Sequence, residues 1–200
     1  MSSIAGCAHA APTIPAVGTA YSVHSASAAP LTSWSASSPG THAEELACNV
    51  VGALTDGLSD RLLAVVLFGS RARGEGSETS DWDLLVIAEG LPAKTFDRTL
   101  YLKQLIPLEW RGRVSILAKT PQQFHGAVSS LYLDVALDGQ ILYDPRGFAA
   151  SRLAALRRGI EHLGLRREPV PEGFDWRWEK TPAASWPLSW PTEVPGRPSG

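Results

Sequence analysis

The sequence predicts an α/β fold, and three observations lead to this prediction. Two short segments, residues 62–68 and 83–87, are rich in Val, Leu and Ile and are continuously apolar except for Asp83 at the start of the second, as strands buried on both faces usually are. Other segments repeat apolar residues every three or four positions, which is the period of an amphipathic helix. The two patterns alternate from residue 41 to about 166. Such alternation is typical of helices packed on a sheet.

The first helix is predicted to begin at Thr41. Thr41 and Glu44 have the spacing of a capping box, in which the two side chains satisfy backbone N–H groups at the helix start. Apolar residues then recur at helical spacing, namely Leu46, Val50, Leu54 and Leu58. The apolar run 62–68 follows and ends at Gly69, so we expect a buried strand there.

The middle of the chain is predicted to hold two strands and two helices. The runs 83–87 and 114–118 have the apolar composition of strands, and residues 92–108 are predicted to form one helix between them. A further helix is predicted to begin at Pro121, because proline is favoured in the first helical turn. Its apolar positions are Phe124, Val128, Leu131 and Val135.

A strand and a helix complete the predicted order. Gly139 is expected to end the preceding helix, and residues 140–143 are expected to form a short strand. The last helix is indicated by the apolar positions Leu153, Leu156, Ile160 and Leu163. Gly164 lies where helices often end in a left-handed residue.

The N-terminal segment, taken as residues 1–40, is interpreted as a disordered tail. Residues 1–43 contain no Asp, Glu, Lys or Arg and are dominated by Ala, Ser, Pro and Thr, a composition that buries too little apolar surface to fold. Two alternatives stay open. One is a secretory signal, disfavoured because a basic start and an unbroken apolar stretch are absent; the other is a start codon assigned too far upstream.

The C-terminal segment, residues 167–200, is interpreted as an arm. It is rich in Pro and holds four of the seven Trp residues, which are Trp176, Trp178, Trp186 and Trp190. The first two alternate as in an edge strand, with both indoles on one face. Packing of the arm on the core is the favoured interpretation; an aromatic face for a partner is the alternative.

Composition narrows the classes of function. The chain has 18 Lys and Arg against 20 Asp and Glu, for a net charge of -2, which argues against a nucleic-acid-binding protein with a basic face. There is no run of eighteen apolar residues, so no membrane-spanning helix is predicted. A cytoplasmic location is the expectation.

A loop suited to phosphate binding follows the first predicted strand. Gly69 permits close approach of the backbone, and Ser70 adds a hydroxyl beside its own N–H. Arg71 and Arg73 can supply fixed positive charge to the phosphates. These four residues are therefore the candidate nucleotide-binding residues.

Two carboxylates follow ten residues later, at the start of the second predicted strand. Asp81 and Asp83 are two positions apart, so on a strand both point to one face while Trp82 points to the other. Paired carboxylates together with substrate phosphates are a common set of Mg²⁺ ligands. An isolated Gly-Ser or Asp-x-Asp usually marks only a turn, but the joint pattern between two apolar strands is far more restrictive.

Gly69-Ser70, ten residues and then Asp81-x-Asp83 resemble the signature of the minimal nucleotidyltransferase family, within the DNA polymerase β-like superfamily. The resemblance is strong over residues 62–88. It implies a small mixed sheet with flanking helices and a nucleotidyltransferase domain over residues 41–166. It also implies that Gly69 and Ser70 bind a nucleoside triphosphate, and that Asp81 and Asp83 are catalytic and hold Mg²⁺ or Mn²⁺. The implied reaction moves a nucleoside monophosphate to an acceptor and releases pyrophosphate.

One position departs from the family pattern. Active members commonly carry a third carboxylate on the next strand, and Ser115 stands at that position here. Asp134 and Asp138, one helical turn apart, are interpreted as the solvated end of a helix rather than as a replacement.

Two functional hypotheses remain. The first is an active nucleotidyltransferase that modifies a protein or a small molecule. The second is a weakly active or inactive nucleotide-binding module that acts through a small helical protein partner, as an antitoxin-like protein. A sugar-nucleotide transferase, a third class that also uses Asp-x-Asp, is disfavoured because such sites lack the upstream Gly-Ser loop.

Overall fold

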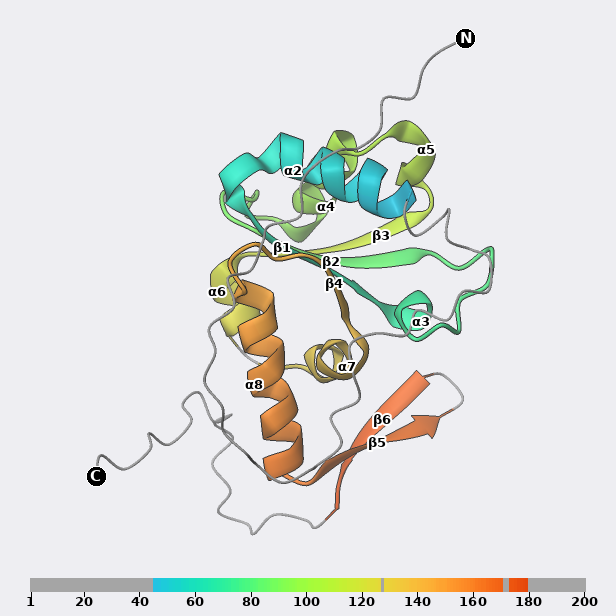
Figure 1. Ribbon diagram of the computed structural model, residues 1–200, viewed down its shortest axis with the longest axis vertical. Coiled ribbons are helices and arrows are strands. Elements are labelled where there is room, and N and C mark those ends of the chain that lie inside the picture. Colours follow the sequence, from blue (N-terminus) through green and yellow to red (C-terminus); the bar gives the residue numbers. More distant parts are fainter. Residues whose placement is uncertain (1–44, 127, 171–172, 180–200) are drawn as a thin grey trace, which may run out of the picture.

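A four-stranded mixed sheet lies at the centre of the structure (Figure 1). The computed structural model describes residues 45–126, 128–170 and 173–179. The strands of the sheet are β1 (Leu62–Phe68), β2 (Trp82–Ala88), β3 (Val114–Lys119) and β4 (Gln140–Tyr143), in the spatial order β3-β2-β1-β4. β1 runs antiparallel to β2 and β4, whereas β2 and β3 are parallel. The predicted α/β class and mixed sheet are confirmed.

Helices cover both faces of this sheet (Figure 1). One layer holds η1 (Leu46–Val51), α2 (Gly52–Leu58), η2 (Ser59–Arg61), α4 (Thr95–Leu105) and α5 (Leu108–Arg111). The other holds α6 (Pro121–His125), α7 (Ser130–Asp138) and α8 (Phe148–His162). Within the described residues, no helix combines the length and the apolar character needed to cross a membrane.

The two helical layers explain why the strand sequences are continuously apolar. Along β2, Leu84 and Val86 pack in the core under the first layer, and Leu85 and Ile87 pack in the core under the second. All four side chains are 0% exposed. A strand with both faces covered has no polar positions in its interior, which accounts for the runs that predicted β1 and β2.

The first described helical segment begins with a π-helical turn, η1, and continues as α2. The four apolar positions predicted to face the core, Leu46, Val50, Leu54 and Leu58, are all buried. The amphipathic pattern is therefore confirmed. The predicted capping box of Thr41 and Glu44 lies outside the described residues.

Two predicted helices are each broken in the structure. The prediction of one helix over residues 92–108 was wrong, because α4 ends at Leu105 and α5 starts at Leu108. Pro107 accounts for this break, since the residue before a proline avoids the helical region, and Ile106 has ψ 154°. The single helix predicted to begin at Pro121 and to be ended by Gly139 was also wrong. It ends at His125, and α7 starts at Ser130.

A hairpin follows the core as a separate two-stranded sheet (Figure 1). Its strands are β5 (Leu165–Val170) and β6 (Gly173–Trp178). The expected boundary between core and arm, after residue 166, falls inside β5. Trp176 packs against the core below α7 and α8, while Trp178 is 39% exposed. The predicted strand and its packing on the core are thus confirmed for this hairpin, and Trp186 and Trp190 lie outside the described residues.

Leucines two positions apart on α4 allow a direct test of the first core. Leu102 is 0% exposed and Leu100 is 50% exposed. We expect Leu102→Ala to lower the free energy of unfolding by about 2–5 kcal/mol, because it leaves a cavity. Leu100→Ala makes the same chemical change in the same helix and is expected to cost less than about 0.5 kcal/mol. Urea denaturation of both variants measures the difference, and equal effects would contradict this packing.

Candidate active site

The register of three strands brings the predicted loop and carboxylates to one end of the sheet. Phe68, the last residue of β1, pairs with Asp83 on β2. Asp83 in turn pairs with Ser115 on β3. The loop that starts at Gly69 is therefore adjacent to Asp83 on one side, and Ser115 is adjacent to it on the other. Residues far apart in the sequence meet here because the strand pairing leaves them no other position.

Gly69 contacts the Asp83 carboxylate more closely than another residue could. A Cβ at residue 69 would lie 2.4 Å from Asp83 Oδ2. Gly69 also has φ +76°, a conformation that disfavours residues with a Cβ. The four-residue helix α3 (Gly69–Ala72) begins at this point. Its end is held to β4 by Gln140, whose Nε2 donates a hydrogen bond of 2.7 Å to the carbonyl oxygen of Ala72.

The two carboxylates lie close enough for their negative charges to repel each other. Burial raises the pKa of Asp83 above its usual value, and the charge of Asp81 raises it further. A hydrogen bond with Ser115 and the charge of Arg73 lower the pKa of Asp83 and oppose these effects. Asp81 itself is exposed, immediately before β2. A bound cation would relieve the repulsion between the two carboxylates and favour the ionised form of Asp83.

The donor set fits a metal that also takes ligands from its substrate. No group of three or more His, Cys, Asp or Glu side chains is placed to hold a metal ion in the part of the chain that the structure describes. Mg²⁺ is commonly held by one or two carboxylates and completes its coordination with phosphate oxygens and water. Asp81 and Asp83 supply such a pair, so they fit Mg²⁺ or Mn²⁺ bound together with a nucleotide.

Arg71 shapes the loop that precedes Asp81. Its Nε donates to the carbonyl oxygen of Ser80 at 2.8 Å, and its second terminal nitrogen donates to that of Glu78 at 3.3 Å. The guanidinium carbon lies 4.4 Å from the centre of the Trp82 ring. Trp82 is 5% exposed, on the face of β2 opposite the carboxylates as predicted. In the structure Arg71 therefore orders the loop, and a contact with phosphate would require it to exchange these bonds.

Arg73 lies between the carboxylates and the C-terminal hairpin. Its Nε donates to Glu75 at 2.7 Å, and its terminal nitrogen is 4.0 Å from Asp138 Oδ2 on α7. The guanidinium carbon is 5.1 Å from the ring centre of Phe174 on β6. The charge of Arg73 also lowers the pKa of Asp83, whereas Arg71 is not among the causes of that shift. Of the two candidate arginines, Arg73 is therefore the one that interacts with the carboxylates.

The interpretation of Asp134 and Asp138 as a solvated helix end was wrong. Asp138 binds both terminal nitrogens of Arg167, and its side chain is 17% exposed. Asp134 accepts a hydrogen bond from the indole nitrogen of Trp176 at 3.1 Å. No local pattern indicates these contacts, since about thirty to forty residues separate the partners. Asp138, Arg167 and Phe174 are thus neighbours of the site that sequence reasoning missed.

A separate hollow of about 370 Å³ lies elsewhere on the molecule. It is lined by residues of β3, α6 and α7, among them Lys119, Gln123 and Tyr132. Lys119 is the last residue of β3, whereas Ser115 is near its start. The hollow is therefore at the other end of the strand from the carboxylate pair.

The comparisons with known proteins agree with this geometry. The family model described as "Polymerase beta, Nucleotidyltransferase" matches residues 57–125, which include the loop, both carboxylates and Ser115. MJ1305 of Methanocaldococcus jannaschii, a candidate protein adenylyltransferase, is 32% identical over 109 residues, or 52% of this chain and 74% of the relative. The chain belongs to the polymerase β-like nucleotidyltransferase family. A second candidate protein adenylyltransferase of that organism, MJ0604, is 28% identical over 46% of this nucleotidyltransferase chain and 90% of its own length.

Two solved structures are similar to this nucleotidyltransferase over half of its residues or slightly more. A chain from a toxin–antitoxin crystal structure with AMP-PNP is 20% identical, with a TM-score of 0.42, over 57% of this chain and 87% of that chain. A candidate nucleotidyltransferase from Sulfolobus solfataricus is 25% identical, with a TM-score of 0.37, over 50% of this chain and 79% of that chain.

Substitutions of two glycines in the nucleotidyltransferase loop distinguish the effect of a steric clash from the effect of backbone strain. Gly69 and Gly74 both have φ +76°, but a Cβ at Gly74 would meet nothing within 4 Å. Gly74→Ala should therefore cost only about 1 kcal/mol of strain. Gly69→Ala must in addition displace the Asp83 carboxylate, so we expect a larger loss of stability and at least tenfold weaker ATP binding. Thermal unfolding and calorimetric titration measure both effects. Equal losses in the two variants would contradict the importance of the Gly69 contact with Asp83.

Proposed function

We propose that this chain is a metal-dependent nucleotidyltransferase that moves a nucleoside monophosphate from a nucleoside triphosphate to a protein or small-molecule acceptor and releases pyrophosphate. The observation that carries the proposal is the contact of Gly69 with Asp83. It places a loop that can bind phosphate against a carboxylate that can bind metal. Membership of the nucleotidyltransferase family supports this reading of the contact.

Each predicted site residue has a role in the proposal. Gly69 and Ser70 bind the triphosphate through backbone N–H groups and the serine hydroxyl. Arg73 supplies positive charge to the outer phosphates, with Arg71 ordering the adjacent loop. Asp81 and Asp83 hold Mg²⁺ or Mn²⁺, which would neutralise charge on the reacting phosphates when bound.

The reaction is an in-line displacement at the α-phosphorus. The acceptor oxygen forms a new bond to that phosphorus while the bond to the bridging oxygen of the β-phosphate breaks. Pyrophosphate carries away the electron pair of the broken bond, and the acceptor hydroxyl loses its proton to water. The protein contributes mainly by positioning the triphosphate and stabilising its charge, as is typical of phosphoryl and nucleotidyl transfer.

The two Methanocaldococcus jannaschii relatives support a narrower form of the proposal. Both are candidate protein adenylyltransferases. By analogy, the nucleotide here is ATP and the acceptor is a hydroxyl group on a protein. A small helical protein, the partner expected from the family resemblance, is the first acceptor to test.

Ser115 is the observation that favours a second candidate function. It is exposed, pairs with Asp83 across β2 and β3, and its side chain lowers the pKa of that carboxylate. A serine hydroxyl does not act as a base near neutral pH, so deprotonation of the acceptor is unassisted at this position. The second candidate is accordingly a nucleotide-binding module that turns over slowly and acts by holding its protein partner.

The carboxylates provide the central test. We expect Asp81→Asn with Asp83→Asn to weaken Mg²⁺-dependent ATP binding at least tenfold and to abolish pyrophosphate release, because the metal loses its charged ligands. Asp97→Asn makes the same chemical change at an exposed position on α4 and should leave both unchanged. Calorimetric titration of the full chain with ATP, with and without Mg²⁺, gives the affinities. Metal-dependent binding that survives in the double variant would overturn the assignment of Asp81 and Asp83.

Ser115 separates the two candidate functions. Ser115→Asp adds a carboxylate beside Asp83, and since a well-placed general base contributes about 10²–10⁴-fold, we expect pyrophosphate release to rise at least tenfold. Ser115→Asn has a similar size without the charge and should give no increase. A wild-type chain that is already fast, with no gain from Ser115→Asp, would contradict the second candidate function.

A further inference from the structure

A cluster of two arginines, a phenylalanine and a carboxylate connects the site with the C-terminal hairpin. The guanidinium carbon of Arg73 is 5.1 Å from the ring centre of Phe174, and that of Arg167 is 4.1 Å from the same centre. Both arginines also approach one carboxylate, that of Asp138 on α7. We call these four residues the arginine cluster. Arg73 is its member nearest to Gly69 and Ser70 in the chain.

The two arginines do not share Asp138 equally. Arg167 donates to both carboxylate oxygens, through its two terminal nitrogens. Arg73 reaches only 4.0 Å from Oδ2, beyond hydrogen-bond distance. The guanidinium of Arg167 compensates the negative charge of this carboxylate and holds both of its oxygens, so the attraction of Asp138 for a second guanidinium is weaker. Arg167 therefore keeps Asp138 from binding Arg73 tightly.

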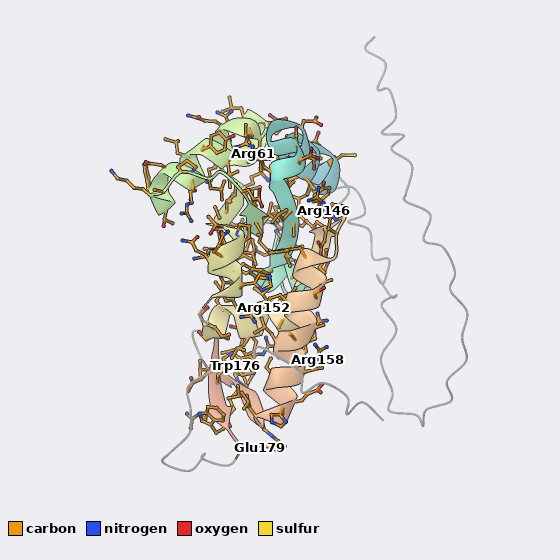
Figure 2. All side chains as sticks on the ribbon, turned by 90° about the vertical axis from the view of Figure 1, so that its left-hand side faces the viewer. Arg61, Arg146, Arg152, Arg158, Trp176 and Glu179 are labelled. Atoms are coloured by element: carbon orange, nitrogen blue, oxygen red, sulfur yellow. The ribbon has the colours of Figure 1, made fainter. Side chains whose placement is uncertain are left out.

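The hairpin that carries Arg167 and Phe174 is anchored independently of Arg73. The indole nitrogen of Trp176 donates to Asp134 on α7 at 3.1 Å, and Arg167 lies 3.5 Å from the same carboxylate. Figure 2 shows Trp176 and Glu179 on the hairpin, at the opposite end of the molecule from Arg61. The hairpin thus has a fixed position against α7, from which Phe174 contacts the Arg73 side chain.

We propose that Arg167 and Phe174 are positioning residues that keep Arg73 available for the triphosphate, so that the C-terminal hairpin is part of the nucleotide site. Arg167 neutralises Asp138, and the Phe174 ring supports the Arg73 guanidinium by a cation–π contact. In the structure Arg73 pairs with Glu75, whose side chain is 58% exposed and can therefore be exchanged for a phosphate in solvent. Without Arg167, the less exposed Asp138 would be an uncompensated carboxylate beside Arg73 and would hold it more tightly. This inference rests on the proposed function, since it assigns Arg73 to the phosphates of a bound nucleotide.

The critical experiment is a rescue by a second substitution. Arg167→Gln frees Asp138 to bind Arg73, so we expect ATP binding to weaken about tenfold or more. AMP lacks the outer phosphates, and its affinity should change less than about twofold. Adding Asp138→Asn removes the competing charge, so Arg167→Gln with Asp138→Asn should recover ATP affinity to within about threefold of the wild type. A merely structural role of the salt bridge is distinguished by AMP, because a general loss of structure in Arg167→Gln would weaken the binding of ATP and of AMP alike.

Arg166 offers a matched control on the same strand. Its side chain is 69% exposed and pairs with Glu179, the residue that follows β6, rather than with α7. Arg166→Gln removes the same charge from the adjacent position and should leave the affinities for ATP and AMP unchanged. An equal loss of ATP affinity in the Arg166 and Arg167 variants would overturn the proposal, because it would reflect net charge alone.

Phe174 supplies a second measurement that does not depend on removing the salt bridge. Phe174→Leu keeps an apolar side chain but has no ring to support Arg73, and we expect it to weaken ATP binding while sparing AMP. Phe174→Tyr keeps the ring and should bind ATP as the wild type does. Circular dichroism establishes that each variant is folded before titration.

The outcomes distinguish failure of the inference from failure of the proposed function. A wild-type chain that binds no nucleotide overturns the proposed function and this inference with it. A wild-type chain that binds ATP, with unchanged affinity in Arg167→Gln and Phe174→Leu, overturns only the inference. Loss of ATP affinity without recovery on adding Asp138→Asn also overturns it.

Discussion

The contact between the Gly69 backbone and the Asp83 carboxylate constrains the rest of the molecule. It requires β1 to end at Phe68, immediately before Gly69. It also requires β1 to pair with β2 in the register that places Phe68 opposite Asp83. Both strands must hold this register, because there is no room at residue 69 for a Cβ, which would lie 2.4 Å from Asp83 Oδ2. The register is held by burial of the strands on both faces, which in turn requires helices above and below the sheet. The three-layer architecture therefore holds the end of β1 and the start of β2 in the register that places Gly69 against Asp83.

The site also stores electrostatic repulsion that the fold must counterbalance. Asp83 is partly buried next to another carboxylate, and burial and charge both raise its pKa. Ser115 and Arg73 oppose this effect but leave the shift upward. Without a cation, the repulsion between the carboxylates lowers the stability of the folded protein. The same repulsion favours binding of a cation, and such a conflict between stability and function is common at functional sites. Ser115 in place of a third carboxylate makes the conflict smaller.

Sequence patterns within short segments predicted the strands, and they also predicted that the loop and the carboxylates lie close together in the chain. The apolar runs predicted β1 and β2, because a strand covered by helices on both faces is apolar at nearly every position. The Gly69-Ser70 and Asp81-x-Asp83 spacing brings the loop and Asp83 together, because the chain returns directly into the adjacent antiparallel strand. The break at Pro107 was missed although its signal was present, since the apolar pattern continued through it. The pairing of Asp138 with Arg167 could not be predicted, because it depends on how a hairpin packs against α7.

The arginine cluster shows how segments outside a family core can act on its site. The family match ends at residue 125, before α7 and before the β5–β6 hairpin. Yet three of the four members of the cluster, Asp138, Arg167 and Phe174, come from these later segments. Only Arg73 belongs to the matched region. The charge environment of Arg73 therefore includes elements that the family match does not contain, and our proposal predicts that two chains with the same loop differ in phosphate affinity when their hairpins differ.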